Sequence, residues 1–328
     1  MNIKTFISVI ITGSLFLNAC QKNTDIFVPD PGQINGPDTS WQNVITASMA
    51  VSILKNNLLL QPYQDSITVN ANIASIVTPF GIQINFPPNS CATAVGQTVT
   101  GRVQVEIQVV KKKGDMIRLN KPSTSNDSLL VTAGQIFIKL KKDGQVLQLA
   151  PNVRINIHYV DLPTNPQMNF FVGDETNTER FNWLPNPDLL NNTLITGTQA
   201  YEIYTNRLRW ISVAYGFNVS TTAKINVAAD IAPYFTNANT TAFTVFKDFR
   251  SVVAMYGDLN TRKFITGKLP LGKQITVVVI SKQGDDYYLG YESAITQIPA
   301  APGSLIQHVR IVPVKKSLPE ILSYLSSL

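Results

Sequence analysis

Charged residues, cysteines and long apolar runs are all scarce in this 328-residue chain, and each shortage excludes a class of protein. Charged residues make up 15% of the sequence, against about 25% in an average soluble domain, which excludes a charged disordered tail and a coiled coil. No apolar run reaches about 18 residues, so a multi-pass membrane protein is excluded. Two cysteines can build neither a disulfide framework nor a cysteine-based zinc site.

The length and the charge of the chain indicate a folded protein with more than one domain. Its 328 residues fit two domains of roughly 100–200 residues each, which is enough to bury sizeable cores without disulfides or metals. The formal net charge is +6. Basic residues gather beside predicted turns and strand ends, without interleaved aromatic residues: Lys111–Lys113, Lys139, Lys141, Lys142, Lys315 and Lys316. This arrangement predicts a solvated rim with no nucleic-acid binding, the alternative being an anionic glycan or lipid headgroup.

Residues 1–20 have the layout of an export signal. Lys4 and the terminal amine form a short positive region, residues 6–17 are mostly apolar, and Ala19 precedes Cys20. About a dozen apolar residues are too few to cross a hydrocarbon core of about 30 Å. The segment therefore predicts a cleaved secretory signal rather than a membrane span.

The end of this signal carries a resemblance. Leu17-Asn18-Ala19-Cys20 resembles the lipobox of bacterial lipoproteins, in which the cysteine is diacylated and becomes the mature N-terminus. Asn18 departs from the small or β-branched residues that are common there, and an ordinary signal peptide with a chance cysteine is the alternative. The resemblance implies a signal peptide over 1–19, lipid attachment at Cys20 and an outer-membrane lipid anchor, with the periplasmic or surface face left open.

Two further segments precede the predicted domains. Residues 20–38 are polar and rich in Pro and Gly without periodicity, which predicts a flexible tether. Residues 39–60 predict a helix, with Thr39 or Ser40 as its cap and a patchy apolar face. If Cys20 carries a lipid, Cys91 is alone, and without a basic neighbour it is expected to be a packed structural residue rather than a nucleophile.

Residues 61–163 alternate between apolar and polar positions, as half-buried strands do. The clearest runs are Ile82–Phe86, Val103–Val109 and Ile136–Leu140, and Asp143-Gly144 predicts a hairpin turn. Short alternating strands with turns about 8–12 residues apart predict an antiparallel β-sandwich with one polar face.

Motifs within this block resemble a known module. Residues 78–90 are similar to the start of a ZU5-type module, and further matches lie at 99–103, 113–116, 120–124, 129–130 and 134–138. Together they resemble an uncharacterised group of Bacteroidota envelope lipoproteins over roughly 66–159, and residues 207–213 resemble a "LGWIN" motif of the same group. The resemblance implies a role in protein–protein assembly and no catalytic activity, by analogy with other ZU5 modules.

The second half of the chain predicts another β-domain and a terminal helix. Residues 164–190 are rich in Pro and Asn, so the inter-domain segment is placed there. Residues 191–314 contain about seven predicted strands, which favours an Ig-like β-sandwich without a disulfide. Residues 315–328 predict a C-terminal helix, because Ser317-Leu-Pro-Glu320 forms a capping box before an apolar face. The predicted fold class is mainly β, with two antiparallel β-sandwiches and a short helix near each end.

No catalytic constellation emerges from the residue types. His158 and His308 fall in different predicted domains without partners at metal-ligand spacing, so both are interpreted as ordinary strand residues. Glycoside hydrolysis needs only one carboxylate pair, and loop Ca²⁺ binding only oxygen ligands. The candidates lie in polar loop sequence typical of solvated turns: Asp174, Glu175, Glu179, Asp285 and Asp286. We expect no catalytic residue, no metal and no cofactor.

Two kinds of surface site are predicted. Asp65-Ser66-Ile67 and Asp127-Ser128-Leu129 resemble O-glycan acceptor sites of Bacteroidota envelope proteins, at Ser66 and Ser128. Tyr287 and Tyr288, near Tyr291, are candidates for contact with a sugar, the alternative being core packing of Tyr287 and Tyr291 beside Leu289.

These observations favour a non-catalytic envelope lipoprotein that acts as a protein-binding or assembly module. Its partners are expected to be the membrane, through the lipid on Cys20, and another envelope protein. The alternative is a glycan-binding or glycan-processing accessory lipoprotein of an outer-membrane uptake system.

Overall fold

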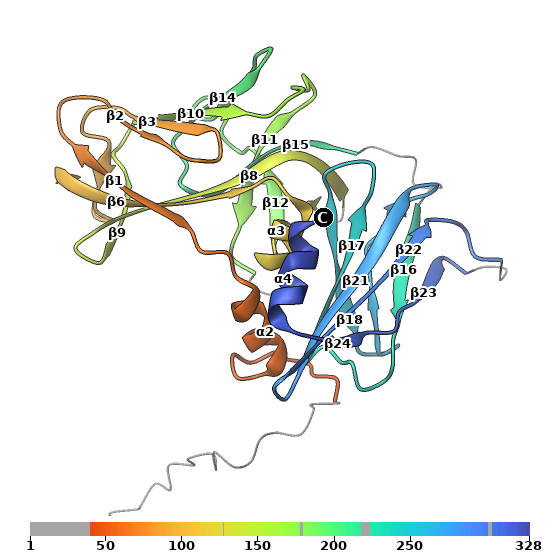
Figure 1. Ribbon diagram of the computed structural model, residues 1–328. Coiled ribbons are helices and arrows are strands. Elements are labelled where there is room, and N and C mark those ends of the chain that lie inside the picture. Colours follow the sequence, from red (N-terminus) through yellow and green to blue (C-terminus); the bar gives the residue numbers. More distant parts are fainter. Residues whose placement is uncertain (1–39, 127, 178–179, 218–223, 301–303) are drawn as a thin grey trace, which may run out of the picture. The chain divides into compact units, whose positions relative to one another are not determined.

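The computed structural model describes residues 40–126, 128–177, 180–217, 224–300 and 304–328 (Figure 1). It is mainly β, with 51% strand and 9% helix, so the predicted fold class is confirmed. The strands pair antiparallel, except that β16 (Lys224–Asp230) and β23 (Ile306–Arg310) run parallel. No helix within these residues is both long enough and apolar enough to span a membrane.

The first sandwich consists of a ten-stranded and a five-stranded sheet. The ten-stranded sheet follows the order β12-β11-β15-β8-β9-β4-β5, with β6 and β7 also on β8 and β1 on β6. Its strands are β1 (Tyr63–Val69), β4 (Cys91–Ala92), β5 (Thr98–Val99), β6 (Gly101–Val110), β7 (Thr124–Ser125), β8 (Ser128–Lys142), β9 (Gln145–Leu149), β11 (Asn169–Asp174), β12 (Asn182–Pro185) and β15 (Arg209–Gly216). The five-stranded sheet has the order β13 (Thr193–Thr196), β14 (Ala200–Thr205), β10 (Ile155–Val160), β3 (Ile82–Phe86) and β2 (Ala74–Val77).

The alternation predicted from the sequence decides which side chains fill this sandwich. In β3, Ile82, Ile84 and Phe86 are buried, and Gln83 and Asn85 between them are only partly so. The buried residues on the facing sides of the two sheets form one apolar cluster, because side chains along a strand point alternately to opposite faces. The predicted hairpin turn is confirmed, since Asp143 and Gly144 join β8 to β9 with φ of 50° and 77°.

The second sandwich is a nine-stranded sheet that surrounds its own core. Its order is β20-β16-β19-β18-β17-β21-β22-β24, with β23 on β16. The strands not yet bounded are β17 (Thr240–Phe246), β18 (Val252–Asp258), β19 (Lys263–Ile265), β20 (Leu269–Pro270), β21 (Gln274–Gln283), β22 (Asp286–Ile295) and β24 (Val314–Lys316). Val277 and Val279 of β21 lie in this core, and Val278 and Ile280 lie in a cluster on its other face. Burial on both faces explains the continuous apolar run of this strand.

The strand pairing divides the chain later than the sequence predicts. Residues 164–190 were expected to connect the two domains, yet β11 and β12 from this segment belong to the ten-stranded sheet. β14 pairs with β10, and β15 pairs with β8, so both also belong to the first sandwich rather than to the predicted 191–314 block. The nine-stranded sheet begins only with β16, and Pro and Asn at 164–190 mark turns within one sandwich.

Two helices match the predicted ends of the fold but are shorter than expected. α2 (Ala50–Leu58) occupies part of the predicted 39–60, because Gln42 is held in an exchange of two hydrogen bonds with Asn237, at 2.9 and 2.7 Å. α4 (Leu318–Ser326) begins directly after its N-cap Ser317, and the predicted capping box of Ser317 and Glu320 is confirmed. Residues 314–316 pair with β22 instead of continuing this helix.

A third helix, α3 (Lys113–Arg118), has no counterpart in the prediction. It lies beside α4, as Figure 1 shows, and the three helices fill the space between the two sandwiches. Leu54 of α2, Met116 of α3 and Ile321 of α4 share one apolar cluster with Trp183 and Trp210 of the first sandwich. The same cluster includes Phe243 of the second sandwich, so a common core joins the two.

Candidate functional site

Of the residues predicted for lipid or O-glycan attachment, the two serines differ in exposure and do not form one site. Cys20 lies outside the described residues, as does Asp127 of one predicted O-glycan motif. Ser128 is exposed at the start of β8, whereas Ser66 of β1 is half-buried and its hydroxyl accepts a hydrogen bond from Arg102 Nε at 3.2 Å. The two serines belong to different strands of the first sandwich, and the structure does not bring them to one site.

The tyrosines of β22 do not form one sugar-stacking surface. Tyr287 and Tyr288 are successive residues and therefore point to opposite faces of the strand. The Tyr287 hydroxyl accepts a hydrogen bond from Asn57 Nδ2 at 2.7 Å, while Tyr288 meets Phe235 edge to face with ring centroids 5.7 Å apart. Tyr291 stacks on Tyr324 of α4 at 4.5 Å. Each ring thus has a packing partner within the fold.

The two histidines and the loop carboxylates lie apart from one another. His158 pairs with Glu202, and His308 pairs with Asp230 at 3.0 Å. Among the candidate carboxylates, Glu175 binds Arg209 at 2.8 Å and Asp286 binds Lys315 at 2.8 Å.

Asp174 caps its own turn, because its carboxylate accepts hydrogen bonds from the amide and the hydroxyl of Thr176, which lower its pKa. Glu179 lies outside the described residues, and within the described chain no three potential ligands cluster in a way that could hold a metal ion. Cys91 is fully buried, and burial raises the pKa of its thiol, as expected for a packed residue.

An exposed sheet edge is the first surface that the sequence analysis missed. β13 pairs with β14 on one side, and no strand of the described chain pairs with its other side. The sequence of β13 is Thr-Leu-Ile-Thr, without charge or proline. Ile195 of this strand is 55% exposed, and Leu189 and Leu190 just before it are 76% and 87% exposed. We call these three residues with the strand the β13 edge.

Hydrogen bonds hold the two leucines on the surface. The Asp188 carboxylate accepts from the backbone and side chain of Asn191, at 3.1 and 2.8 Å, and these bonds lower the pKa of Asp188. The buried Asn192 donates to the Asp188 carbonyl and accepts from the Thr205 hydroxyl at 2.6 Å. Leu189 and Leu190 therefore protrude from a turn whose shape is fixed by the hydrogen bonds of Asp188 and Asn192.

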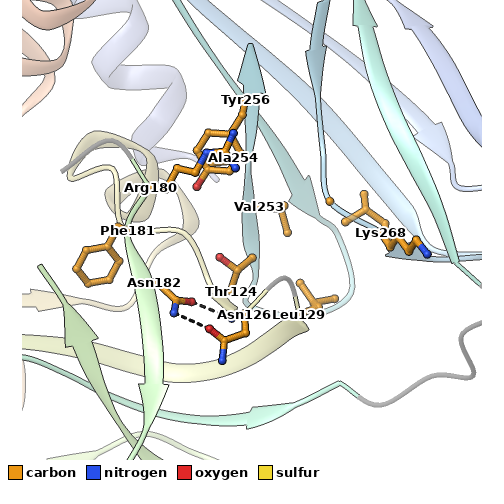
Figure 2. A pocket seen from close by; sticks show the side chains of 12 residues that line it. Thr124, Asn126, Leu129, Arg180, Phe181, Asn182, Val253, Ala254, Tyr256 and Lys268 are labelled. Atoms are coloured by element: carbon orange, nitrogen blue, oxygen red, sulfur yellow. Dashed lines mark hydrogen bonds between the residues drawn. The ribbon is translucent and has the colours of Figure 1, made fainter. Parts of the chain in front are cut away.

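A cleft between the two sandwiches is the second surface (Figure 2). A hollow of about 140 Å³ lies next to one of about 810 Å³, and five residues line both: Asn126, Arg180, Tyr256, Gly267 and Lys268. Figure 2 shows Arg180 reaching toward Tyr256, with Asn126 and Asn182 hydrogen-bonded to each other nearby. We call this the Arg180 cleft.

Different parts of the chain supply the walls of the Arg180 cleft. Asn126 follows β7, Arg180 precedes β12, Tyr256 belongs to β18 and Lys268 precedes β20. The floor of the smaller hollow is apolar, since Leu129, Val253 and Leu269 are buried there. The local sequence gives no sign of the cleft, because its members are far apart along the chain.

No protein-family model matches the chain, and no curated protein matches it.

Proposed function

We propose that this chain is a non-catalytic lipoprotein of the cell envelope that binds a partner protein along the β13 edge. The proposal combines the lipobox-like sequence at Cys20, which implies an outer-membrane anchor, with the resemblance to ZU5-type assembly modules. The observation that carries it is the β13 edge, where a strand with one unpaired side presents three exposed aliphatic side chains from itself and the preceding turn.

The chemistry of this edge selects an extended, apolar segment as the ligand. An unpaired strand offers backbone N–H and C=O groups to a strand from another chain, and alternate side-chain positions give specificity. β13 is short, at four residues, but it contains none of the lysine, proline or inward charge that protects many natural edges. Leu189 and Leu190 add apolar contact area from a turn that loses little conformational freedom on binding.

Photo-crosslinking in cells tests the partner interaction. A crosslinking amino acid at position 195 of the full chain should give a covalent adduct with one envelope protein. Leu190→Lys should abolish the adduct, because a charge would be buried against the partner. Val95→Lys is the matched control, since Val95 is 82% exposed in a turn of the other sheet.

The test compares the amount of crosslinked adduct that these two variants form. An adduct that survives Val95→Lys and disappears with Leu190→Lys supports the proposal. Absence of any adduct, or equal loss in both variants, contradicts it. Amide hydrogen exchange of residues 193–196 should also slow in the purified complex, because the free strand edge becomes paired.

The anchor has its own test. Mass spectrometry of the mature protein from native membranes should find an acylated Cys20 as the first residue, and Cys20→Ala should leave the signal uncleaved. A mature protein that begins at any other residue contradicts the lipid anchor without affecting partner binding at the β13 edge.

Glycan binding is the second candidate function, and the Arg180 cleft favours it. Amide, guanidinium and aromatic groups line a hollow that lies next to a larger one. Such groups suit sugar rings, because amides both donate to and accept from hydroxyl groups and aromatic rings pack on apolar faces.

A further inference from the structure

The charges around the Arg180 cleft are unbalanced within the described chain. Three cationic side chains line its two hollows, namely Arg180, Lys224 and Lys268, against a single carboxylate, that of Asp258. Asp258 already accepts a hydrogen bond from the Asn260 amide at 2.9 Å, and hydrogen bonds lower its pKa. None of the three cations forms a salt bridge with a carboxylate of the residues that the structure describes. Asp127 and Glu179, next in sequence to Asn126 and Arg180, lie outside the described residues. Three cations without a carboxylate partner among the described residues can attract an anionic group.

The geometry of Arg180 prepares it for a carboxylate. Its guanidinium lies over the Tyr256 ring, 4.6 Å from the ring centroid. This cation–π contact occupies a flat face of the guanidinium and leaves the N–H groups in its plane to bind a ligand. The N–H groups of a guanidinium match the two oxygens of a carboxylate in a bidentate pair.

Neighbouring amides can bind hydroxyl groups. The Asn126 backbone N–H donates to Asn182 Oδ1 at 2.8 Å, and Asn182 Nδ2 donates to Asn126 Oδ1 at 2.9 Å. This exchange fixes the orientation of both amides and leaves further donor and acceptor capacity on each. In the larger hollow, the Asn226 amide is oriented in the same way, by donating to the Thr266 carbonyl at 2.7 Å.

The size of the cleft indicates an extended ligand rather than a small ion. The smaller hollow, of about 140 Å³, has an apolar floor, and the larger one, of about 810 Å³, continues along β18 and β19. A free inorganic anion would leave the apolar floor and the distant amides without contacts. A chain of sugar rings with carboxylate groups would contact the guanidinium, the amides and the apolar floor together.

We infer that the Arg180 cleft binds an acidic oligosaccharide, with Arg180 holding a carboxylate and the asparagines holding ring hydroxyls. The inference rests on the second candidate function and is independent of partner binding at the β13 edge. Substitution of Arg180 is therefore expected to leave the crosslink from position 195 unchanged, and Leu190→Lys to leave sugar binding unchanged. Each proposal can therefore be contradicted without affecting the other.

Isothermal titration calorimetry of the detergent-solubilised full chain tests this inference with three probes: hexagalacturonate, its methyl ester and hexaglutamate. Hexagalacturonate should bind, and added salt should weaken the binding, since the contacts are charged. Its methyl ester should bind at least about tenfold more weakly, because it lacks the carboxylate that pairs with the guanidinium. Hexaglutamate should also bind more weakly, because it lacks ring hydroxyls.

Matched arginine variants locate the binding. Arg180→Ala should weaken hexagalacturonate binding at least about tenfold, and Arg180→Lys should have an intermediate effect because it keeps the charge without the planar fork. Arg310→Ala, on the exposed part of β23, removes the same charge and should change affinity by less than about twofold. Lys268→Met removes a second positive charge from the lining of the cleft. Because Lys268 is exposed, this substitution should leave the fold intact.

Several results would overturn the inference. No binding of hexagalacturonate, equal binding of its methyl ester, or preference for hexaglutamate would each exclude an acidic sugar as the ligand. Equal effects of Arg180→Ala and Arg310→Ala would show that net charge, and not the cleft, attracts the probe. Release of new reducing ends from hexagalacturonate would contradict the non-catalytic function while leaving the binding site in place.

Discussion

Arg250 and Asp161 form an ion pair that links the two sandwiches. Arg250 Nη1 lies 3.2 and 3.1 Å from the two carboxylate oxygens of Asp161 and also donates to the Ala133 carbonyl. Arg250 lies between β17 and β18, whereas Asp161 directly follows β10. The neighbouring Ser251 hydroxyl donates to the Leu130 carbonyl at 2.5 Å. One short segment of the second sandwich thus makes polar contacts with two parts of the first, β8 and the residue that follows β10.

Arg250→Ala is expected to destabilise the fold by about 2–3 kcal/mol, because the Asp161 carboxylate, only 16% exposed, would lose the guanidinium that pairs with it. Urea unfolding of the purified chain measures this loss. Lys247→Ala, at an exposed position of the same loop, is the control and should change stability by no more than about 0.5 kcal/mol. Similar losses in the two variants would show that the ion pair does not stabilise the junction.

Gly114→Ala should disrupt the contact between α3 and α4. A β-carbon at Gly114 would lie 1.7 Å from the Leu325 carbonyl oxygen, so one helix must move. Overpacking of this kind costs about 1–3 kcal/mol, and helix α4 should lose protection in amide hydrogen exchange.

Gly96→Ala is the control for this substitution, because a β-carbon there meets no atom within 4 Å although φ is +84°. The control should cost about 1 kcal/mol from backbone strain alone and leave α4 protected. Unchanged protection of α4 in Gly114→Ala would contradict the predicted clash.

Local patterns in the sequence account for the strands but not for their partners. The alternation of Ile82–Phe86 and the turn at Asp143-Gly144 depend on neighbours in sequence, so both were predictable. The pairing of β15 with β8 joins residues that are more than seventy positions apart, and no local signal identifies that partner. The predicted boundary at 164–190 failed for this reason, since proline and asparagine mark a turn whether or not a domain ends there.

The candidate surfaces were hidden from the sequence for the same physical reason. Arg180 and Tyr256 meet only because β12 and β18 come together across the shared core. In the sequence, Leu189 and Leu190 lie in a polar segment that was predicted to connect two domains. Their exposure follows from the hydrogen bonds of Asp188 and Asn192. Tyr287 and Tyr288, by contrast, were recognisable as aromatic neighbours, yet the pleat of β22 points them apart.

The capping box of α4 should make stability depend on acid pH. Hydrogen bonds from Lys316 and Ser317 lower the pKa of Glu320 from 4.5 to about 2. A carboxyl whose pKa is lowered by folding stabilises the native state above the unfolded pKa, and this contribution disappears as the pH falls toward 2. Glu320→Gln should therefore be less stable than the natural chain at pH 7, and the difference should vanish near pH 2.

Unfolding midpoints across this pH range measure the effect of Glu320. Glu292→Gln, at an exposed position of β22, removes one carboxylate elsewhere and should not reproduce the pH-dependent difference. A constant difference between Glu320→Gln and the natural chain from pH 7 to pH 2 would contradict a role for the ionised carboxylate.

Lys121 should give a second dependence of the same sign, at alkaline pH. Its ammonium lies 3.7 Å from the centroid of the Phe181 ring and 5.2 Å from that of Trp210, and burial lowers its pKa from 10.5 to about 8. Because the folded state loses this proton more easily than the unfolded state, native stability should rise as the pH increases from about 8 to 10.5. Lys121→Met should lack this rise, whereas the exposed Lys268→Met should retain it. NMR titration of the Lys121 side chain with a midpoint near 8 would establish the cause, and a midpoint near 10.5 would contradict it.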